Sequence, residues 1–376
     1  MKIVFDANPI TQNTKSGVGY FTTSLITALS KNSPKDVRLV GHYFNFLNRK
    51  SVTEQPSGKN ISYKHSSLFP TKVLNIGRRL GLQLPIEAFS HQKADFTLFT
   101  NFTAMPTILG GKRVSIIYDV SFLDCPEYAP DRLISYLRKW VPYTVNTSDL
   151  IIVNSEFTKQ RLVDEYKINK EIVIVLPIPP IDHVEPDDKI LHKMRINEKY
   201  ILFVGTIEPR KNLEILIEAY TKLDKDIREN YSLVLAGGKG WKDESILQKI
   251  KTMKEKGFNI KQTGYVSDAE KSALYQHAAL CVQPSLYEGF GMPILEAMSY
   301  GKPVVCSDIP VFHEVAGDAA IYFNPKSSDS ITKCISHILS DQDTKKDIIQ
   351  LSKKRVKDYP TWDKIGKELY DKLVEL

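Results

Sequence analysis

Short apolar runs recur along the whole chain, and apolar residues at helical spacing lie between them. Val18, Phe21, Leu25, Ile26 and Leu29, for example, follow the first run at the spacing of one helix face. Uninterrupted apolar runs are typical of strands that are buried on both faces of a parallel sheet. The runs lie at 3–5, 38–40, 96–99, 114–117, 150–153 and 172–176, and then at 200–204, 233–236, near 260, at 280–282 and at 304–305. This alternation predicts an α/β fold with helices on both faces of each sheet.

The strand-like runs form two series, and we predict a Rossmann-like, doubly wound domain for each. A chain of 376 residues is longer than one core usually organises. The prolines at 177–180 and the polar residues after them mark the boundary between the series. We place an N-terminal domain at 1–180, a linker at 181–198 and a C-terminal domain at 199–359.

The composition is that of a soluble globular protein, with 42% hydrophobic and 25% charged residues. No apolar run is long enough to span a bilayer, and Asp6 interrupts the first apolar segment too early for a secretory signal. We therefore expect a cytoplasmic protein. The cysteines show neither metal-ligand spacing nor a disulfide framework, and we interpret them as small buried hydrophobic residues: Cys125, Cys281, Cys306 and Cys334.

Most of the positive charge lies in the N-terminal half. Of the formal net charge of +7, about +6 falls in residues 1–185 when Asp and Glu are subtracted from Lys and Arg. Such an excess fits an anionic membrane surface or a phosphate-bearing substrate, and it fits scattered solvated lysines equally well. Residues 48–67 and the basic stretch 72–79 have the least regular pattern, and we expect loops there. Lys72, Arg78 and Arg79 stand among apolar residues, which suits peripheral membrane contact or a helix packed on its own core.

The segment Gln283–Gly301 carries two carboxylates, Glu288 and Glu296, between two strand-like runs. Pro293 suits the first turn of a helix, and Gly301 suits its end. Glu288 then lies on the loop at the carboxyl end of a strand, and Glu296 lies in the first turns of the helix. The loop amides are predicted to point into the crevice where an open α/β sheet binds ligands, and they belong to Gly289, Phe290, Gly291 and Met292. Such a loop can hold an anion by its amides and a polyol by its carboxylates.

A second segment, Gly205–Asn212, follows the first strand of the C-terminal domain. Asn212 is a favourable N-cap for the helix after it, so Arg210 and Lys211 are predicted at a helix N-terminus that faces the same crevice. Two fixed cations beside the positive end of a helix make a diphosphate site that needs no metal. The alternative is that both side chains are solvated on a loop.

Two short segments of the N-terminal domain are further candidates. Gly17, in Ser16–Gly19 after the first strand, can bring backbone amides close to a phosphate, although a plain turn explains the glycines as well. Tyr118 and Asp119 follow another strand of that domain and are expected near the mouth of the same crevice. For Tyr118 the alternative is a buried tyrosine whose hydroxyl is bonded internally.

Together these segments resemble retaining glycosyltransferases of the GT-B architecture, in the large family 4 that includes bacterial mannosyltransferases of surface-polysaccharide synthesis. The resemblance covers nearly the whole chain and is most specific from Ile201 to Asp308. Two motifs match there, and these are Gly205 with Arg210-Lys211-Asn212, and Glu288-Gly-Phe-Gly-Met-Pro-Ile-Leu-Glu296. The resemblance implies two domains that face each other across a cleft, with a last helix at about 360–376 packed back on the N-terminal domain.

The resemblance also implies a role for each candidate residue. Arg210 and Lys211 would neutralise the leaving diphosphate, Glu288 and the loop amides would hold the donor sugar and distal phosphate, and Glu296 would bind ribose hydroxyls. Gly17 would approach the phosphates. We count as catalytic Arg210, Lys211, Glu288 and Asp119. The donor-binding set is Gly17, Tyr118, Gly205, Gly264, Tyr265, Val266, Gly289, Phe290, Gly291, Met292 and Glu296, of which residues 264–266 would border the base.

One position departs from the family pattern. Tyr118 stands where the family often has histidine, and tyrosine cannot supply imidazole chemistry, so the contacts to the donor sugar stay open. No residue stands out as a covalent nucleophile. We therefore expect same-face attack, in which the departing phosphate oxygen takes the proton of the acceptor.

The expected partners are a nucleotide-sugar donor and a glycan or lipid-linked glycan acceptor, with an anionic membrane as a peripheral contact on the inner face of the plasma membrane. Overall likeness favours GDP-mannose as donor, and UDP-sugars stay open. We expect no cofactor, no metal and no nucleic acid. The rival classes are a sugar-nucleotide epimerase with the same diphosphate cradle and a non-catalytic sugar-nucleotide sensor. A hydride-transfer enzyme has little support, because no dinucleotide fingerprint follows either first strand.

Overall fold

The computed structural model describes residues 1–11, 16–48, 50–52, 55–67, 77, 84–90, 93–181, 183–196 and 199–376. The chain forms two compact units. The first unit combines Met1–Leu123, Arg132–Pro179 and Pro360–Leu376, and the second combines Asp124–Asp131 and Pro180–Tyr359. The basic stretch 72–79 lies, apart from residue 77, outside the described residues, so its predicted membrane contact stays a prediction.

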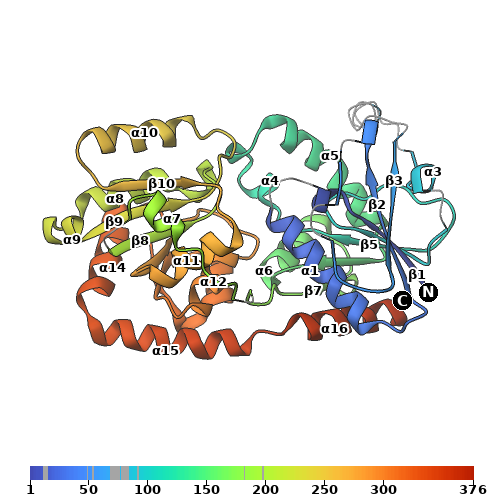
Figure 1. Cartoon of the computed structure of the whole chain (residues 1–376). Coiled ribbons are helices and arrows are strands. Elements are labelled where there is room, and N and C mark those ends of the chain that lie inside the picture. The colour runs from blue at the N-terminus through green and yellow to red at the C-terminus, as the bar shows by residue number, and fades with distance from the viewer. Residues whose placement is uncertain are drawn as a thin grey trace. The chain divides into compact units, whose positions relative to one another are not determined.

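A parallel sheet forms the centre of the first unit (Figure 1). Among the described residues its strand order is β3-β2-β1-β4-β5-β6-β7, and each neighbouring pair is parallel. The order reverses between β1 and β4, which makes this the switch point of a doubly wound sheet. The strands are β1 (Lys2–Asp6), β2 (Arg38–Phe44), β3 (Ile61–Ser66), β4 (Phe96–Phe99), β5 (Lys112–Ile116), β6 (Leu150–Val153) and β7 (Val173–Val175).

Helix α1 (Gly17–Asn32) connects β1 to β2 and begins where the sequence offers a cap. The Ser16 hydroxyl oxygen accepts a hydrogen bond from the Gly19 amide at 3.1 Å, so one of the open donors of the first turn is bonded. The predicted apolar face is buried. The other helices along this part of the chain are η1 (Asn8–Thr11), η2 (Phe46–Asn48), α3 (Glu87–Ser90), α4 (Ser121–Asp124), η3 (Pro126–Tyr128), α5 (Asp131–Thr147), α6 (Glu156–Tyr166) and η4 (Lys170–Ile172).

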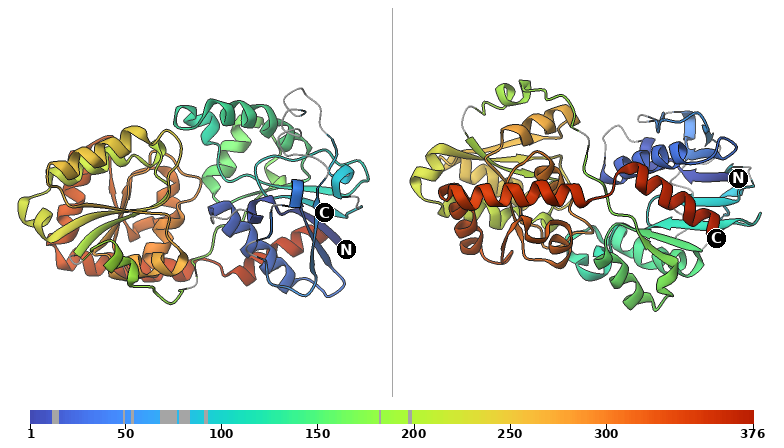
Figure 2. Two further views of the ribbon diagram at one scale, coloured as in Figure 1. Left: turned by 45° about the horizontal axis from the view of Figure 1, so that its top comes forward. Right: turned by 90° about the horizontal axis from the view of Figure 1, so that it is seen from below.

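The last helix, α16 (Trp362–Glu375), belongs to the first unit and lies beside α1 (Figure 2). The Trp362 ring packs at 5.7 Å from that of Phe21, and Lys31 forms an ion pair with Asp363 at 2.7 Å. Gly366 lies so close to α1 that a Cβ atom there would stand 2.4 Å from the Ala28 carbonyl. The contact between the two helices therefore needs a residue without a side chain.

The second unit has its own parallel sheet, with strand order β10-β9-β8-β11-β12-β13 in the described part of the chain. The order reverses between β8 and β11, which is the switch point of this sheet. The strands are β8 (Lys199–Val204), β9 (Tyr231–Ala236), β10 (Ile260–Gly264), β11 (Leu280–Gln283), β12 (Val304–Ser307) and β13 (Ile321–Phe323).

Helices pack on both faces of this second sheet (Figure 1). Side chains of α8, α10 and α14 share one apolar core with Ile201 and Phe203 of β8. Tyr200 points to the opposite face, where its hydroxyl donates to the Leu274 carbonyl of α11 at 2.7 Å. The helices are α7 (Lys189–Lys193), η5 (Pro209–Lys211), α8 (Leu213–Lys222), α9 (Lys225–Asn230), α10 (Glu244–Glu255), α11 (Asp268–His277), α12 (Met292–Ser299), α13 (Pro310–Ala316), η6 (Gly317–Ala319), α14 (Ser328–Ser340) and α15 (Gln342–Asp358).

The structure confirms the α/β fold with two Rossmann-like parallel sheets and corrects the expected loops at 48–67. Residues Ile61–Ser66 form β3, an edge strand parallel to β2. Its residues alternate between partly buried and exposed, so it lacks the uninterrupted apolar run of a central strand. Cys125, Cys281 and Cys306 are buried as expected, and Cys334 is partly exposed. Within the described residues, no helix combines the length and the apolar character needed to cross a membrane.

Candidate active site

Two loops meet at the switch point of the second sheet, because they follow the neighbouring strands β8 and β11. One loop carries Glu208, Arg210 and Lys211, and the other carries Ser285 and Glu288. Backbone contacts join the loops directly, since the Leu286 amide donates to the Arg210 carbonyl at 2.9 Å. The carboxyl ends of strands at a switch point are where open α/β sheets bind ligands. The two sequence motifs therefore lie together at a place suited to binding.

The Asn212 side chain also holds the loops together. Asn212 has the predicted N-cap position before α8, but its side chain does not act as the predicted cap. The φ of Asn212 is +58°. The side-chain amide instead donates to the Pro284 carbonyl at 3.0 Å and to the Pro325 carbonyl at 2.8 Å. A short polar side chain in a left-handed turn is well placed to reach other loops in this way. Asn212 thus fixes the β8 loop against the β11 loop.

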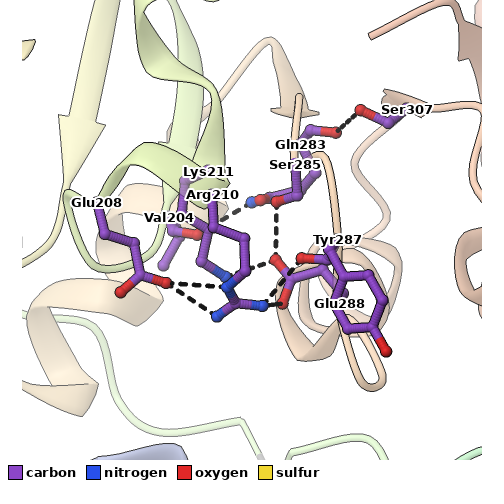
Figure 3. Close-up of polar contacts among 9 residues, drawn as sticks. All are labelled: Val204, Glu208, Arg210, Lys211, Gln283, Ser285, Tyr287, Glu288 and Ser307. Carbon is purple, nitrogen blue, oxygen red and sulfur yellow. Dashed lines mark hydrogen bonds and ion pairs between the residues drawn. The ribbon is translucent and has the colours of Figure 1, made fainter. Parts of the chain in front are cut away.

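Glu288 is the centre of a buried charge cluster (Figure 3). One carboxylate oxygen accepts from Lys211 Nζ at 2.5 Å and from the Ser285 hydroxyl at 2.7 Å. The other oxygen accepts from Arg210 Nη1 at 2.9 Å. Burial raises the pKa of Glu288, but the charges of Lys211 and Arg210 outweigh it and lower that pKa to about 2. Glu288 is therefore ionised at neutral pH.

Arg210 has a second acidic partner, Glu208, which the sequence analysis did not single out. Arg210 Nε and Nη2 donate to one oxygen of Glu208 at 3.2 and 2.9 Å, and Nη1 also donates to the Tyr287 carbonyl at 2.9 Å (Figure 3). Glu208 is 3% exposed, so it is a structural part of the cluster rather than a solvated side chain. With Glu288 and Lys211, the cluster contains two cations and two carboxylates.

The Arg210 and Lys211 side chains differ in the number of hydrogen bonds that they donate to the described residues. The Arg210 guanidinium donates hydrogen bonds to Glu208, Tyr287 and Glu288. In the described residues, the Lys211 ammonium makes one, to Glu288. An ammonium group has three donors, so Lys211 keeps donors for a ligand while it stays paired. The arrangement thus offers a cation that can bind an anion beside a guanidinium that orders the carboxylates.

Glu296 lies on α12, four residues after its first residue, and is 4% exposed. Its carboxylate accepts from Lys271 Nζ and from the Tyr275 hydroxyl, each at 2.8 Å. Burial and the charge of Glu296 raise the pKa of Tyr275 well above its ordinary value, so Tyr275 is protonated and donates. Lys271 and Tyr275 were missed, although they stand four residues apart on α11 and so on one face of that helix. Helix α11 begins with a capping box of Ser267 and Glu270, which the spacing of these two residues in the sequence predicts.

The loop between Glu288 and α12 needs glycine at one position. Gly291 has φ +110°, and a Cβ atom there would lie 2.8 Å from the Phe312 ring. Pro293 stands in the first turn of α12 and Gly301 follows its end with φ +63°, as predicted. The neighbouring predicted residues, Gly289, Phe290 and Met292, are all buried or half-buried in this turn.

The remaining predicted residues of the second unit border the same strand ends. Gly205 follows β8 directly, and Gly264 ends β10 with φ +74°. Tyr265 and Val266 continue from Gly264, and the Tyr265 side chain is half exposed. A glycine segment after β9 was missed. A Cβ atom at Gly237 would stand 1.9 Å from the Gly205 carbonyl oxygen, so two backbone segments pass very close together there.

The candidates of the first unit lie at the carboxyl ends of its own strands. Gly17 is the first residue of α1. The Tyr118 hydroxyl donates to the Thr100 carbonyl at 2.9 Å, and burial raises the pKa of this hydroxyl. One oxygen of Asp119 accepts from the Ser121 amide at 2.9 Å at the start of α4. The bonded hydroxyl matches the alternative that was kept for Tyr118. The structure describes each unit by itself, so the donor roles of these three residues stay predictions.

A family model for "Glycosyl transferases group 1" matches residues 187–355. An O-antigen chain mannosyltransferase B of Escherichia coli is 29% identical over 356 residues, which cover 91% of each chain. The O-antigen chain mannosyltransferase RfbU of Salmonella typhimurium is 30% identical over 332 residues, 86% of this chain and 88% of the relative. The chain belongs to the group 1 glycosyltransferases. This glycosyltransferase is a hexosyltransferase, as its sequence predicted.

The fold of this glycosyltransferase also matches solved structures. Anabaena HepE, solved in complex with UDP and glucose, superposes with a TM-score of 0.75 over 100% of both chains at 16% sequence identity. At this identity the likeness concerns the fold alone. The expected GT-B architecture is thereby confirmed for the glycosyltransferase.

Proposed function

We propose that this glycosyltransferase moves a mannosyl residue from GDP-mannose to a hydroxyl group of a glycan or lipid-linked glycan in O-antigen-type polysaccharide synthesis. The observation that carries this proposal is the near full-length likeness to two O-antigen chain mannosyltransferases. The site supports it, because a buried pair of cations and a pair of carboxylates suit a ligand with a diphosphate and sugar hydroxyls. A UDP-sugar is the second candidate donor, since the HepE structure contains UDP and glucose.

The proposed step breaks the bond between the anomeric carbon and the phosphate oxygen of the donor. Negative charge then grows on the leaving diphosphate, where Lys211 donates hydrogen bonds and stabilises it. The acceptor hydroxyl attacks from the face that the leaving group occupies. Its oxygen bonds to the anomeric carbon while its proton passes to the departing phosphate oxygen. The product keeps the anomeric configuration of the donor.

Each carboxylate has a proposed part in holding the donor. Glu288 is ionised and buried, so it can accept hydrogen bonds from sugar hydroxyls once the donor enters. Glu296 is proposed to accept from ribose hydroxyls, with Lys271 and Tyr275 fixing its orientation. The proposal assigns charge neutralisation to Arg210 and Lys211 and uses no metal. Transfer at an unchanged rate in excess EDTA would support that part, and loss of transfer that Mg²⁺ or Mn²⁺ restores would contradict it.

The decisive experiment gives the purified enzyme a panel of GDP- and UDP-sugars, with a mannose-terminated lipid-linked oligosaccharide as acceptor. We expect transfer from GDP-mannose. The NMR spectrum of the product should show an α-anomeric mannosyl signal, because the reaction retains the α configuration of the donor. Transfer from a UDP-sugar alone would select the second candidate. A β-linked product would contradict retention.

A sugar-nucleotide epimerase is separated by leaving the acceptor out. An epimerase converts the donor into a new sugar nucleotide, whereas the proposed transferase gives only slow hydrolysis. Chromatography of the nucleotide fraction distinguishes the two results. A protein that binds sugar nucleotides without turning any of them over would be the non-catalytic sensor.

We also propose that the enzyme works at the cytoplasmic face of a membrane when its acceptor is lipid-linked. The support is the basic excess of the N-terminal half and the basic and apolar composition of residues 72–79. Co-sedimentation with phosphatidylglycerol vesicles at low salt tests the contact. Absence of the protein from the vesicle pellet would contradict it.

A further inference from the structure

A large hollow opens in the first unit at the amino ends of β1, β2 and β3, with a volume of about 1380 Å³. This is the end of the sheet opposite to the one from which Gly17 and Tyr118 follow. Six cationic side chains from separate segments line it, and these are Lys2, Lys31, Lys35, Arg38, Lys59 and Lys64. No carboxylate is among the described residues of its lining. We call this site the basic hollow.

Among the described residues, most of these charges have no acidic ion-pair partner. Lys31 pairs with Asp363 at 2.7 Å. In the part of the chain that the structure describes, no carboxylate forms an ion pair with the other five. Lys2 and Arg38 are direct cross-strand neighbours on β1 and β2. Like charges in that position repel each other and destabilise a sheet, so an anion bound between them would reduce this repulsion.

The cations of the basic hollow also repel one another, and the pKa of Lys2 shows this effect. Partial burial lowers the pKa of Lys2, and the positive charges of Lys64 and Arg38 lower it further, against the opposite effect of Asp95. A bound anion would reverse this effect. Among the described residues, Asp95 supplies a negative charge near Lys2, but burial and the two neighbouring cations outweigh it, so a bound anion would be favoured beside Lys2.

One wall of the hollow is a loop that the chain fixes to α1. The Ser57 amide donates to the Thr27 hydroxyl at 3.0 Å, and the Ser30 hydroxyl donates to the Asn60 side chain. A Cβ atom at Gly58 would lie 1.9 Å from Ser30 Oγ, so the loop can approach α1 this closely only with glycine there. Lys59 is therefore carried on an anchored loop.

The volume and the lining select the class of ligand. Six cations spread over a hollow of about 1380 Å³ exceed what a single phosphate can contact. In the described part of the hollow, Val40 and Ile61 are the only aliphatic hydrophobic residues among charged, hydroxyl and amide side chains, so the lining suits a phosphate-bearing group better than an acyl chain. We propose that the basic hollow is an anion-binding site, separate from the donor site, for a ligand that carries two or more phosphate groups. Such a ligand is either a soluble polyphosphorylated molecule or the headgroup of an anionic lipid.

The test uses the full-length protein and a charge-reversed pair, Arg38→Glu with Lys64→Glu. Both side chains are exposed, so the fold should tolerate the change. The matched control is Arg132→Glu with Lys170→Glu, because these exposed residues of the first unit do not line the hollow and their replacement changes the charge by the same amount. The probes are inorganic tripolyphosphate in calorimetry and vesicles that contain cardiolipin, a lipid with two phosphate groups, in co-sedimentation, both at low salt.

We expect the 38/64 variant to lose at least ten-fold in affinity for tripolyphosphate, for the vesicles or for both, and the control to stay within about two-fold of the wild type. Binding of tripolyphosphate identifies a soluble ligand, and binding of vesicles alone identifies a lipid headgroup. Equal losses in both double variants, or no binding of either probe, would overturn the proposal. So would loss of tripolyphosphate binding in Lys211→Ala, because that result would place the anion at the donor site.

Discussion

The two cations beside Glu288 lie next to each other in the sequence, and their surroundings give them different tasks. Arg210 is hydrogen-bonded to Glu208, Glu288 and a carbonyl, so its guanidinium orders the two loops. Within the described part of the chain, the Lys211 ammonium makes one hydrogen bond, to Glu288, and can direct its other donors to a phosphate. An arginine is the better residue for the first task, because its planar fork can bridge two carboxylates.

This difference leads to a prediction for the single alanine variants. Both Arg210→Ala and Lys211→Ala should lower kcat by about 10²–10³-fold, because removal of one donor to a developing negative charge has that effect. Arg210→Ala should in addition lower the free energy of unfolding by about 3–5 kcal/mol, since it leaves the buried carboxylate of Glu208 without its cation while Glu288 keeps Lys211. Lys211→Ala should lower it less, because Glu288 keeps Arg210.

Steady-state kinetics and urea unfolding measure the two effects separately. Lys225→Ala is the control, because this lysine is also in the second unit and its side chain is 77% exposed. Near wild-type turnover by Lys211→Ala would remove Lys211 from the leaving-group role. Equal stability of both variants would show that Arg210 does not order the loops.

Glu288 allows a prediction about pH, because its folded pKa is lowered to about 2. A lowered pKa contributes stability above the unfolded value of about 4.3 and loses it as the pH falls toward the folded value. Glu288→Gln should therefore be less stable than the wild type by about 3–5 kcal/mol at pH 7. The difference should shrink between about pH 4.5 and pH 2.

Urea unfolding at a series of pH values measures that difference. Glu229→Gln serves as the control, because this exposed glutamate pairs only with Lys225 among the described residues, and its loss should cost under about 0.5 kcal/mol. A constant difference between wild type and Glu288→Gln across the acid range would mean that the ionised carboxylate is not the source of the stability.

Residue types in the motifs identified the principal charges of the site but not all their partners. Glu288, Arg210 and Lys211 were predicted from a loop, a helix start and a strand end, and the structure brings them within hydrogen-bond distance. Glu208 lies two residues before Arg210 inside the same motif, and nothing in its spacing distinguishes a buried ion-pair partner from a solvated loop residue. Burial of that loop depends on the β11 loop, which is about 75 residues away in sequence.

At the scale of elements, the central strands were predictable because burial on both faces demands an uninterrupted apolar run. Edge strands were predicted less well, because an edge strand pairs on one side and needs no such run: β7 and β10 were predicted, whereas β3 and β13 were not. β13 has three residues, too few for a periodic signal. Helix caps show the same limit of local patterns. Ser267 and Ser16 cap their helices as local sequence rules predict, whereas the side chain of Asn212 bonds to residues from two distant loops.

The contact of α16 with α1 yields a prediction about one glycine. Gly366→Ala should lower the free energy of unfolding by about 1–3 kcal/mol, because the new methyl group would overlap the Ala28 backbone and push the helices apart. The change should be seen in urea unfolding, with no effect of the exposed neighbour substitution Lys367→Ala beyond about 0.5 kcal/mol. A Gly366→Ala variant as stable as the wild type would mean that the helices can separate without cost.

At the scale of the whole molecule, the charged residues that we assign to the donor diphosphate and ribose all belong to the second unit, in the loops at the β8–β11 switch point and on α12. The first unit carries the basic hollow and most of the net charge. One chain thus combines two regions suited to anions, one in each compact unit. A nucleotide and a polyphosphate should therefore protect different backbone amides from hydrogen exchange.

Hydrogen exchange of the backbone amides, with and without GDP, tests the proposed donor site. We expect GDP to slow amide exchange in residues 205–212 and 285–296, because a bound diphosphate accepts hydrogen bonds from loop amides and orders both loops. If Gly17 approaches the phosphates as predicted, amides 17–19 should be slowed as well. Lys211→Ala with GDP is the control and should lose all of this protection. Protection by GDP confined to the first unit would contradict the proposed donor site, because no charged residue assigned to the diphosphate or the ribose lies there.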